Sequence, residues 1–187
     1  MPKLIYTSLA SLDGYIADEE GAFDWAVPDE EVLVFLNDLE RSVGTYLYGR
    51  RMYELMIGWE TDPAAAAQSA ASGDFARIWQ AADKVVYSTT LTAVSTARTR
   101  LERSFDADAV RRLKEAATQD LNVSGPDLAA DALRAGVVDE FNVVIAPVVV
   151  GGGKRLFPDH LRVDLELLEQ RRFDNGMAYL RYRTTSD

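Results

Sequence analysis

Two arginines follow a glycine at the end of a short apolar run, in the stretch YGRRMYE. Gly49 ends the run, and Arg50 and Arg51 open a segment that favours a helix. A helix N-terminus with two guanidinium groups beside it could bind an anion such as a phosphate. A pair of solvated arginines is the alternative.

Hydroxyl groups and a glycine follow two other apolar runs. VVYSTT places the hydroxyls of Ser88–Thr90 at the end of one run, although such residues are common wherever a strand meets a loop. NVSGPDLA places Ser124-Gly125-Pro126 before a helix-like segment, where glycine lets a ligand approach the backbone and the helix N-terminus favours an anion. A plain strand-to-helix turn is the alternative there.

A polar loop, SLDGYIADEEGAFDWAVPDEE, separates the first apolar run from a helix-like segment. It carries Asp13, Trp25 and Glu30, and Pro28 suits the approach to a helix. In an open α/β sheet, ligands bind beyond the carboxyl ends of the strands, so this loop is a candidate part of a site. The alternative is a surface loop with an anchoring tryptophan and a helix cap.

The stretch VVVGGGKRLFP invites comparison with phosphate-binding loops. The pattern G-x-x-x-x-G-K-[ST] would need glycine at Val148 and a hydroxyl residue at Arg155, so it fails twice. The dinucleotide fingerprint G-x-G-x-x-G would need a third glycine at Leu156, and no helix pattern follows. The glycines therefore need an explanation other than phosphate binding.

Alternating strand-like and helix-like segments must position these residues. Strands are predicted at LIYTSLA, TYLY, KVVYS, LNVS and the longer run 138–150, which are rich in β-branched and aromatic residues. Helices are predicted at about 29–42, FARIWQAA, DADAVRRLKEAAT and PDLAADALRAG, from apolar spacing and from proline and glycine at the ends. The segment 61–74 is expected to be a surface excursion with some helix.

The C-terminal part carries a hairpin signal. Asp174-Asn175-Gly176 separates the strand-like runs LELLEQRRF and MAYLRYR. Together with the alternating segments, this predicts a three-layer α/β/α fold whose mostly parallel sheet is covered on both faces and ends in an antiparallel hairpin. One domain spanning 1–187 is expected.

Composition excludes several functions. A formal charge of −10 argues against a nucleic-acid or anionic-membrane surface, although a local basic pocket stays possible. The absence of cysteine excludes disulfides and thiolate sites, and the single His160 cannot form a His-rich cluster, so no metal site is expected. No leader or membrane-spanning run stands out, which favours a cytoplasmic protein.

Several short motifs follow one another along nearly the whole chain, in an order that is typical of one protein superfamily. They are Ser11-Leu12-Asp13-Gly14, Trp25-x-x-Pro28-x-Glu30, Gly49-Arg50-Arg51, Tyr87-Ser88-Thr89, the segment from Leu121 to Leu133, Val138-Asp139-Glu140 and Gly153 to Pro158. In this order the chain resembles the dihydrofolate reductase-like superfamily. The resemblance is greater to the branch of the reductase (C-terminal) domain of the riboflavin-biosynthesis deaminase-reductase.

The resemblance implies an NADPH-dependent reductase that acts on a pteridine- or pyrimidine-type heterocycle. Glu30 and Asp13 would be the catalytic carboxylates, and Trp25 and Asp29 would contact the substrate. The implied cofactor-binding residues are Ile16, Ala17, Gly49, Arg50, Arg51, Ser88, Thr89, Ser124, Gly125 and Leu128. Arg50 and Arg51 beside the hydroxyls of Ser88 and Thr89 would favour NADPH over NADH.

Departures from the family pattern leave the substrate open. FDWAVPDEE and MIGWETDPAAAA stand where segments serving a phosphoribosyl substrate are usual, so the sequence is compatible with both a dihydrofolate reductase-like activity and a 5-amino-6-(5-phosphoribosylamino)uracil reductase-like activity. The glycine stretch would be a structural turn beside the active site, and no deaminase half can exist without cysteine. An NADP(H)-binding module without turnover would also fit the sequence, as would a dimeric structural or regulatory protein. A homodimer is expected, because VVIAPVVV or the C-terminal hairpin would need a covering partner.

Overall fold

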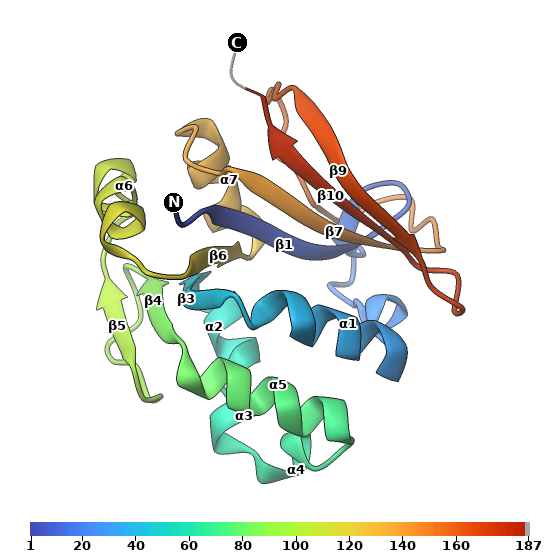
Figure 1. The fold of residues 1–187 in the computed structure, drawn as a ribbon, viewed down its shortest axis with the longest axis horizontal. Coiled ribbons are helices and arrows are strands. Elements are labelled where there is room, and N and C mark those ends of the chain that lie inside the picture. Colours follow the sequence, from blue (N-terminus) through green and yellow to red (C-terminus); the bar gives the residue numbers. More distant parts are fainter. Residues whose placement is uncertain (186–187) are drawn as a thin grey trace.

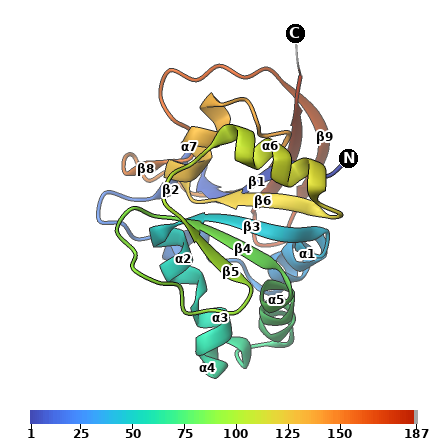
Figure 2. The same cartoon turned by 90° about the vertical axis from the view of Figure 1, so that its left-hand side faces the viewer.

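The computed structural model describes residues 1–185 and shows one large sheet with helices on both faces (Figures 1 and 2). The eight strands lie in the order β5-β4-β3-β6-β1-β7-β10-β9. Their bounds are β1 Leu4–Ser11, β3 Val43–Gly49, β4 Asp83–Tyr87, β5 Thr99–Glu102, β6 Asp120–Ser124, β7 Glu140–Ala146, β9 Leu165–Arg172 and β10 Ala178–Thr184. All neighbouring strands from β5 to β7 are parallel, and β10 is antiparallel to both β7 and β9. The predicted mostly parallel sheet with an antiparallel end is confirmed.

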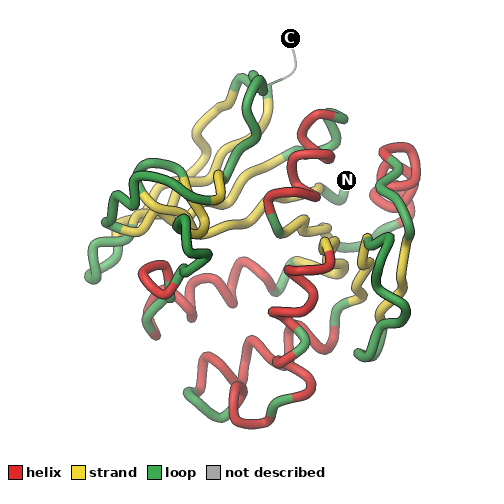
Figure 3. Tube along the Cα trace, turned by 180° about the vertical axis from the view of Figure 1, so that it is seen from behind, coloured by secondary structure: helices red, strands yellow, loops and turns green. Residues whose placement is uncertain are grey.

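Helices cover the two faces of the sheet unequally (Figure 3). Their bounds are α1 Glu30–Glu40, α2 Arg50–Met56, α3 Gly58–Thr61, α4 Pro63–Ala66, α5 Ala70–Ala81, α6 Ala107–Ala116 and α7 Pro126–Arg134. One apolar cluster joins α6 and α7 to β1, β3 and β6, while two others join α1 to β7 and β10, and α5 to β3 and β4. Successive residues of β3 therefore serve opposite layers, with Leu47 in the first cluster and Tyr46 and Tyr48 in the third.

Local sequence signals explain most element ends. The Asp29 carboxylate caps α1 by accepting a hydrogen bond from the Val32 N–H at 3.0 Å. Pro126 opens α7, and Gly136, with φ +63°, follows its end. Gly176, with φ +87°, completes the turn of the predicted hairpin.

Two predicted boundaries are wrong. The run 138–150 forms a strand only over Glu140–Ala146, because Pro147 cannot donate a hydrogen bond to a neighbouring strand. In the segment 61–74, Asp62 caps α4 and Ser69 caps α5, so helix begins well before FARIWQAA. The short 3-10 helix Asp24–Ala26, strand β5 and the small sheet of β2 (Tyr15–Ala17) and β8 (Lys154–Arg155) were not predicted.

Candidate functional site

A large cleft opens at the carboxyl ends of the parallel strands. It has a volume of about 1810 Å³ and is bordered by residues that directly follow β4 and that end β3 and β6. The α1 helix, α2 and the small β2–β8 sheet supply its other walls. This is where ligands bind in open α/β sheets.

Every residue expected from the resemblance to bind the cofactor lines this cleft. They are Ile16, Ala17, Gly49, Arg50, Arg51, Ser88, Thr89, Ser124, Gly125 and Leu128. These residues are up to 112 positions apart in the chain, from Ile16 to Leu128. The topology brings them together because the parallel strands end at the same edge of the sheet.

The two arginines at the start of α2 have different environments. The Arg50 guanidinium donates to Glu54 Oε1 at 2.7 Å and to Thr90 Oγ1 at 3.0 Å. Arg51 is exposed and has no ion-pair partner within residues 1–185. Arg50 is therefore held in place, whereas Arg51 is available to an anion.

Ser88 shapes the turn after β4. Its Oγ accepts hydrogen bonds from the backbone N–H groups of Thr90 at 3.2 Å and Leu91 at 2.9 Å. The Arg103 guanidinium, which also lines the cleft, donates to the Ser88 carbonyl at 3.2 Å. The hydroxyl thus acts on the backbone of the turn that borders the cleft.

Two glycines permit close approaches beside the cleft. Gly125 has φ +92°, and a Cβ there would lie 3.2 Å from Met52 Cβ. Gly153 has φ +120°, and a Cβ there would lie 2.2 Å from the Ala17 carbonyl oxygen, a distance that no side chain tolerates. Gly153 therefore lets the loop after β7 cross the backbone of β2, in agreement with a structural turn at the border of the site.

The four residues expected to be catalytic or substrate-binding lie outside the cleft lining, contrary to the expected placement. Asp13 accepts hydrogen bonds from the N–H groups of Val150 at 3.2 Å and Gly151 at 2.8 Å. The Ser11 hydroxyl, followed by these backbone donors, lowers the pKa of the Asp13 carboxyl. Asp13 thus fastens the glycine loop to the turn after β1.

Trp25, Asp29 and Glu30 are likewise absent from the cleft lining, although Ala26, Val27 and Pro28 between them belong to it. Trp25 packs against the apolar cluster that includes Val32 and Leu36, and Asp29 is occupied as the cap of α1. Glu30 is exposed, and its Oε1 accepts from the Ala71 N–H of α5 at 3.2 Å. The first turn of α1 faces α5, which explains why Glu30 does not reach the cleft.

Sequence comparison assigns the family. The RibD C-terminal domain matches residues 2–179. The chain belongs to this family. It is 28% identical over 190 residues to the uncharacterized protein YyaP of Bacillus subtilis (strain 168), covering 96% of this chain and 94% of that protein.

Structural comparison places this RibD C-terminal domain among dihydrofolate reductase-like folds. A Shewanella sp. PV-4 structure, provisionally named a riboflavin biosynthesis protein, superposes with a TM-score of 0.77 at 21% identity, covering 98% of this chain and 99% of that one. Dihydrofolate reductase from Enterococcus faecalis, complexed with NADP(H) and RAB-propyl, gives a TM-score of 0.65 at 14% identity, covering 98% and 97%. The predicted fold class is confirmed, and the family supports a reductase-type function.

One carboxylate of the cleft was missed in the sequence. Glu40, the last residue of α1, is buried and lines the cleft together with Leu33 and Leu36 of the same helix. Burial raises the pKa of Glu40 to about 7, and the nearby Tyr46 hydroxyl and the hydrogen bond from Asn122 oppose that rise. The signal was available, because Glu40 follows Leu36 by four residues and therefore shares the buried face of the helix.

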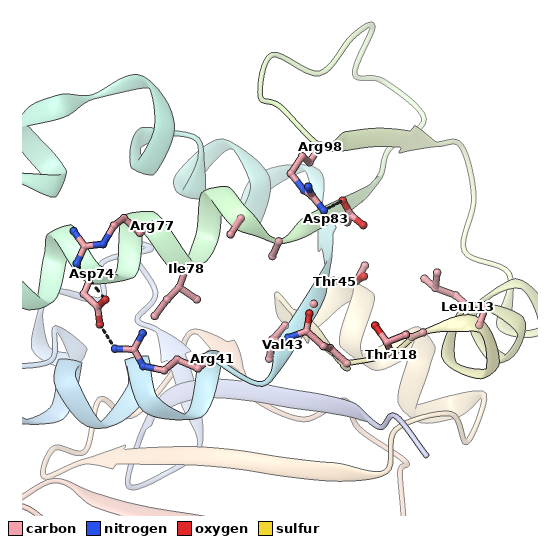
Figure 4. A pocket seen from close by; sticks show the side chains of 16 residues that line it. Arg41, Val43, Thr45, Asp74, Arg77, Ile78, Asp83, Arg98, Leu113 and Thr118 are labelled. Atoms are coloured by element: carbon pink, nitrogen blue, oxygen red, sulfur yellow. Dashed lines mark hydrogen bonds and ion pairs between the residues drawn. The ribbon is translucent and has the colours of Figure 1, made fainter.

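A second hollow lies at the opposite, amino-terminal ends of β3 and β4 (Figure 4). It has a volume of about 650 Å³, and its arginines are paired. Asp74 binds both Arg41 and Arg77, while Asp83 binds Arg98 at 3.0 Å. The guanidinium groups of this hollow already have carboxylate partners, so they are less available to bind an anionic ligand than Arg51 in the cleft.

Proposed function

We propose that the protein is an NADPH-dependent reductase that transfers hydride to a pteridine- or pyrimidine-type heterocycle. The observation that supports this most is the convergence of all ten implied cofactor-binding residues on one cleft. At about 1810 Å³, the cleft is larger than the roughly 300–1,000 Å³ typical of a pocket for one small ligand. It has room for a dinucleotide and an acceptor together.

The strand-end residues fit the parts of NADPH. Arg51, which has no ion pair within the described chain, suits the 2′-phosphate, and the Thr90 hydroxyl holds Arg50 beside it. Gly125 opens the nine-residue helix α7 without a side-chain cap, so its backbone can be approached by a pyrophosphate. Bound there, the cofactor would supply the hydride, and the protein would orient the two ligands.

Apolar side chains of the cleft suit a planar acceptor. Leu33 and Leu36 come from α1, Met52 and Met56 from α2, and Phe75 from α5. Such a wall excludes water from the reacting atoms and packs against a flat ring. Both a dihydrofolate reductase-like and a 5-amino-6-(5-phosphoribosylamino)uracil reductase-like acceptor fit this description.

Fluorescence titration with NADPH and NADH, followed by an acceptor screen, tests the proposal. The screen contains dihydrofolate, other pterins and the aminouracil ribosyl phosphate. We expect tighter binding of NADPH and its oxidation by at least one acceptor. Tight binding without oxidation would instead indicate a binding module, and no nucleotide binding would reject the proposed function.

We also propose a homodimer formed through β9. Strand β7 is paired on both sides within the chain, so the only exposed sheet edge near the C-terminal end is β9, among the described strands (Figure 1). Leu165, Leu167 and Leu168 of β9 are exposed by 40%, 46% and 39%. Light scattering should give twice the 20.7 kDa chain mass, and Leu167→Lys should halve it. A wild-type mass of one chain would reject the dimer.

All helices within residues 1–185 are too short or too polar to traverse a lipid bilayer. A cytoplasmic location stays a prediction from the sequence.

A further inference from the structure

Glu40 combines burial with a carboxylate oxygen that has no partner among residues 1–185. The residue is 6% exposed, and its Oε1 accepts a hydrogen bond from Asn122 Nδ2 at 3.1 Å. Its Oε2 is buried without a hydrogen-bond partner in the described part of the chain. Leaving such an oxygen unpaired costs free energy, so folded proteins rarely do so without a reason.

The Tyr46 hydroxyl, from β3 and beside this carboxylate, also lacks a hydrogen-bond partner within the part of the chain that the structure describes. It is close enough to influence the pKa of Glu40, but it lies outside hydrogen-bonding geometry. Glu40 and Tyr46 both line the cleft. Two orphaned polar atoms at one place in a cleft mark a position where a ligand's polar edge would complete the hydrogen bonding.

The groups that face Glu40 come from three strands. Tyr46 and Tyr48 of β3 are the titratable ones, and Asn122 of β6 links the carboxylate to Thr7 of β1. Arg41, the next residue along, is turned outward to Asp74. The facing groups that shift the pKa of Glu40 carry no positive charge, so the neutral acid is favoured up to about neutral pH.

Asn122 fixes the orientation of the carboxyl and connects it with the cofactor side of the cleft. Its Nδ2 donates to Thr7 Oγ1 at 2.8 Å as well as to Glu40 Oε1, and its Oδ1 accepts from Ser124 Oγ at 2.9 Å. The amide is thus held by three partners. Ser124 is among the residues implied to bind the cofactor, so one hydrogen-bonded chain spans both parts of the cleft.

We propose that Glu40 is the proton donor of the cleft and that the acceptor is a planar heterocycle with a C=N bond. This inference rests on the proposed reductase function. As hydride from a reduced nicotinamide dinucleotide adds to the carbon, the O–H bond at Glu40 Oε2 breaks and an N–H bond forms on the acceptor nitrogen. Glu40 is left as a carboxylate and regains its proton from solvent. Asn122 is the positioning residue.

A carboxylic acid with these surroundings suits a C=N acceptor better than a carbonyl. Proton transfer is most efficient when the donor's pKa is near the working pH, and a ring nitrogen is basic enough to take a proton from such an acid. The Tyr46 hydroxyl is placed to hydrogen-bond the same ring edge.

The first test measures protonation without turnover. Infrared difference spectra between about pH 6 and pH 9 should show a protonated carboxyl band that Glu40→Gln removes. Glu31→Gln, the same change at an exposed site of α1, should keep the band. Absence of the band in the wild type at pH 6 would overturn the inference.

The second test measures single-turnover hydride transfer to 7,8-dihydrofolate, or to any C=N acceptor that the screen finds. Glu40→Gln should slow it by about 10²-fold or more and abolish its decline above neutral pH, with NADPH affinity unchanged. Asn122→Ala should move that decline to higher pH, because the lost donor favoured the ionised form. Glu40→Asp should recover part of the rate.

The outcomes separate the two proposals. If NADPH neither binds nor is oxidised by the wild type, the proposed function fails, and the inference fails with it. If NADPH oxidation is equally fast in wild type and Glu40→Gln, or if only carbonyl acceptors are turned over, the inference alone fails. Thermal melts of each variant confirm that a lost rate is not lost folding.

Discussion

The cleft has two walls of different construction. The strand-end wall consists of the turns at Gly49–Arg51, Ser88–Thr90 and Ser124–Gly125, which directly follow or end β3, β4 and β6. The helix wall consists of Leu33, Leu36 and Glu40 on α1. In the strand-end wall, side chains such as Ser88 and Arg50 are held by hydrogen bonds within the chain. In the helix wall, a buried carboxylate oxygen has no partner among the described residues.

This difference suggests separate roles for the walls. A wall whose turns are held by internal hydrogen bonds is rigid before the ligand binds. Such a wall suits a cofactor that is the same in every reaction cycle. A wall with an unpaired buried acid costs stability that only a ligand, or a reaction, can offset. Substitutions in each wall can test whether the cost is real and whether the roles are divided in this way.

Glu40 should make stability strongly pH-dependent. Its pKa in the folded state, about 7, lies above the ordinary value of 4.5, so the folded protein binds the proton more tightly. The contribution of Glu40 to stability is therefore fully present below about pH 4.5 and is lost as pH rises through 7. Between about pH 5.5 and 8.5 the loss amounts to roughly 2 kcal/mol, and Glu40→Gln should escape it.

Denaturant unfolding at the two pH values measures this effect. The free energy of unfolding of Glu40→Gln, relative to the wild type, should rise with pH by about that amount. Glu31→Gln is the matched control and should follow the wild type. A difference that stays constant with pH would mean that Glu40 carries no raised pKa, and the contrast between the walls would disappear.

Arg51→Ala tests the strand-end wall. A charge-assisted contact with the 2′-phosphate contributes roughly 1.5–3 kcal/mol, so NADPH affinity should fall by about 10- to 100-fold while NADH affinity changes little. Arg162→Ala, at an arginine whose side chain is 87% exposed and which lies outside the cleft lining, is the control. An equal loss of affinity for NADPH and NADH would show that Arg51 does not bind the 2′-phosphate.

The residues of the strand-end wall could be predicted from the sequence, because the strand order alone determines where they lie. Once β3, β4 and β6 are parallel neighbours, the residues after them must meet, whatever their side chains do. The helix wall could not be read in this way. Whether Glu30 or Glu40 enters the cleft depends on how α1 is rotated and on the packing of its first turn against α5, which motif spacing does not fix.

Asp29 was recognised as a notable residue in the sequence, but its role in the structure is to cap a helix. Asp29 was expected to contact substrate and instead caps α1, so Asp29→Ala should lower the free energy of unfolding by about 1 kcal/mol. Asp29→Asn keeps a side-chain acceptor and should lose much less. Thermal or denaturant melts of the pair measure this. A large change in the KM for the acceptor, without a change in stability, would show that Asp29 contacts the substrate after all.

The smallest effect is expected at Glu30, the acid that motif spacing selects. Glu30→Gln keeps the Oε1 acceptor for the Ala71 N–H, and the residue is exposed, so stability should change by less than about 0.5 kcal/mol. Its turnover should fall by much less than the roughly 10²-fold expected when a positioned acid is removed. Measured beside Glu40→Gln under the same conditions, this variant decides which end of α1 serves the reaction. A Glu30→Gln rate that is 10²-fold down, with Glu40→Gln still active, would mean that α1 turns its first residue into the cleft when ligand binds.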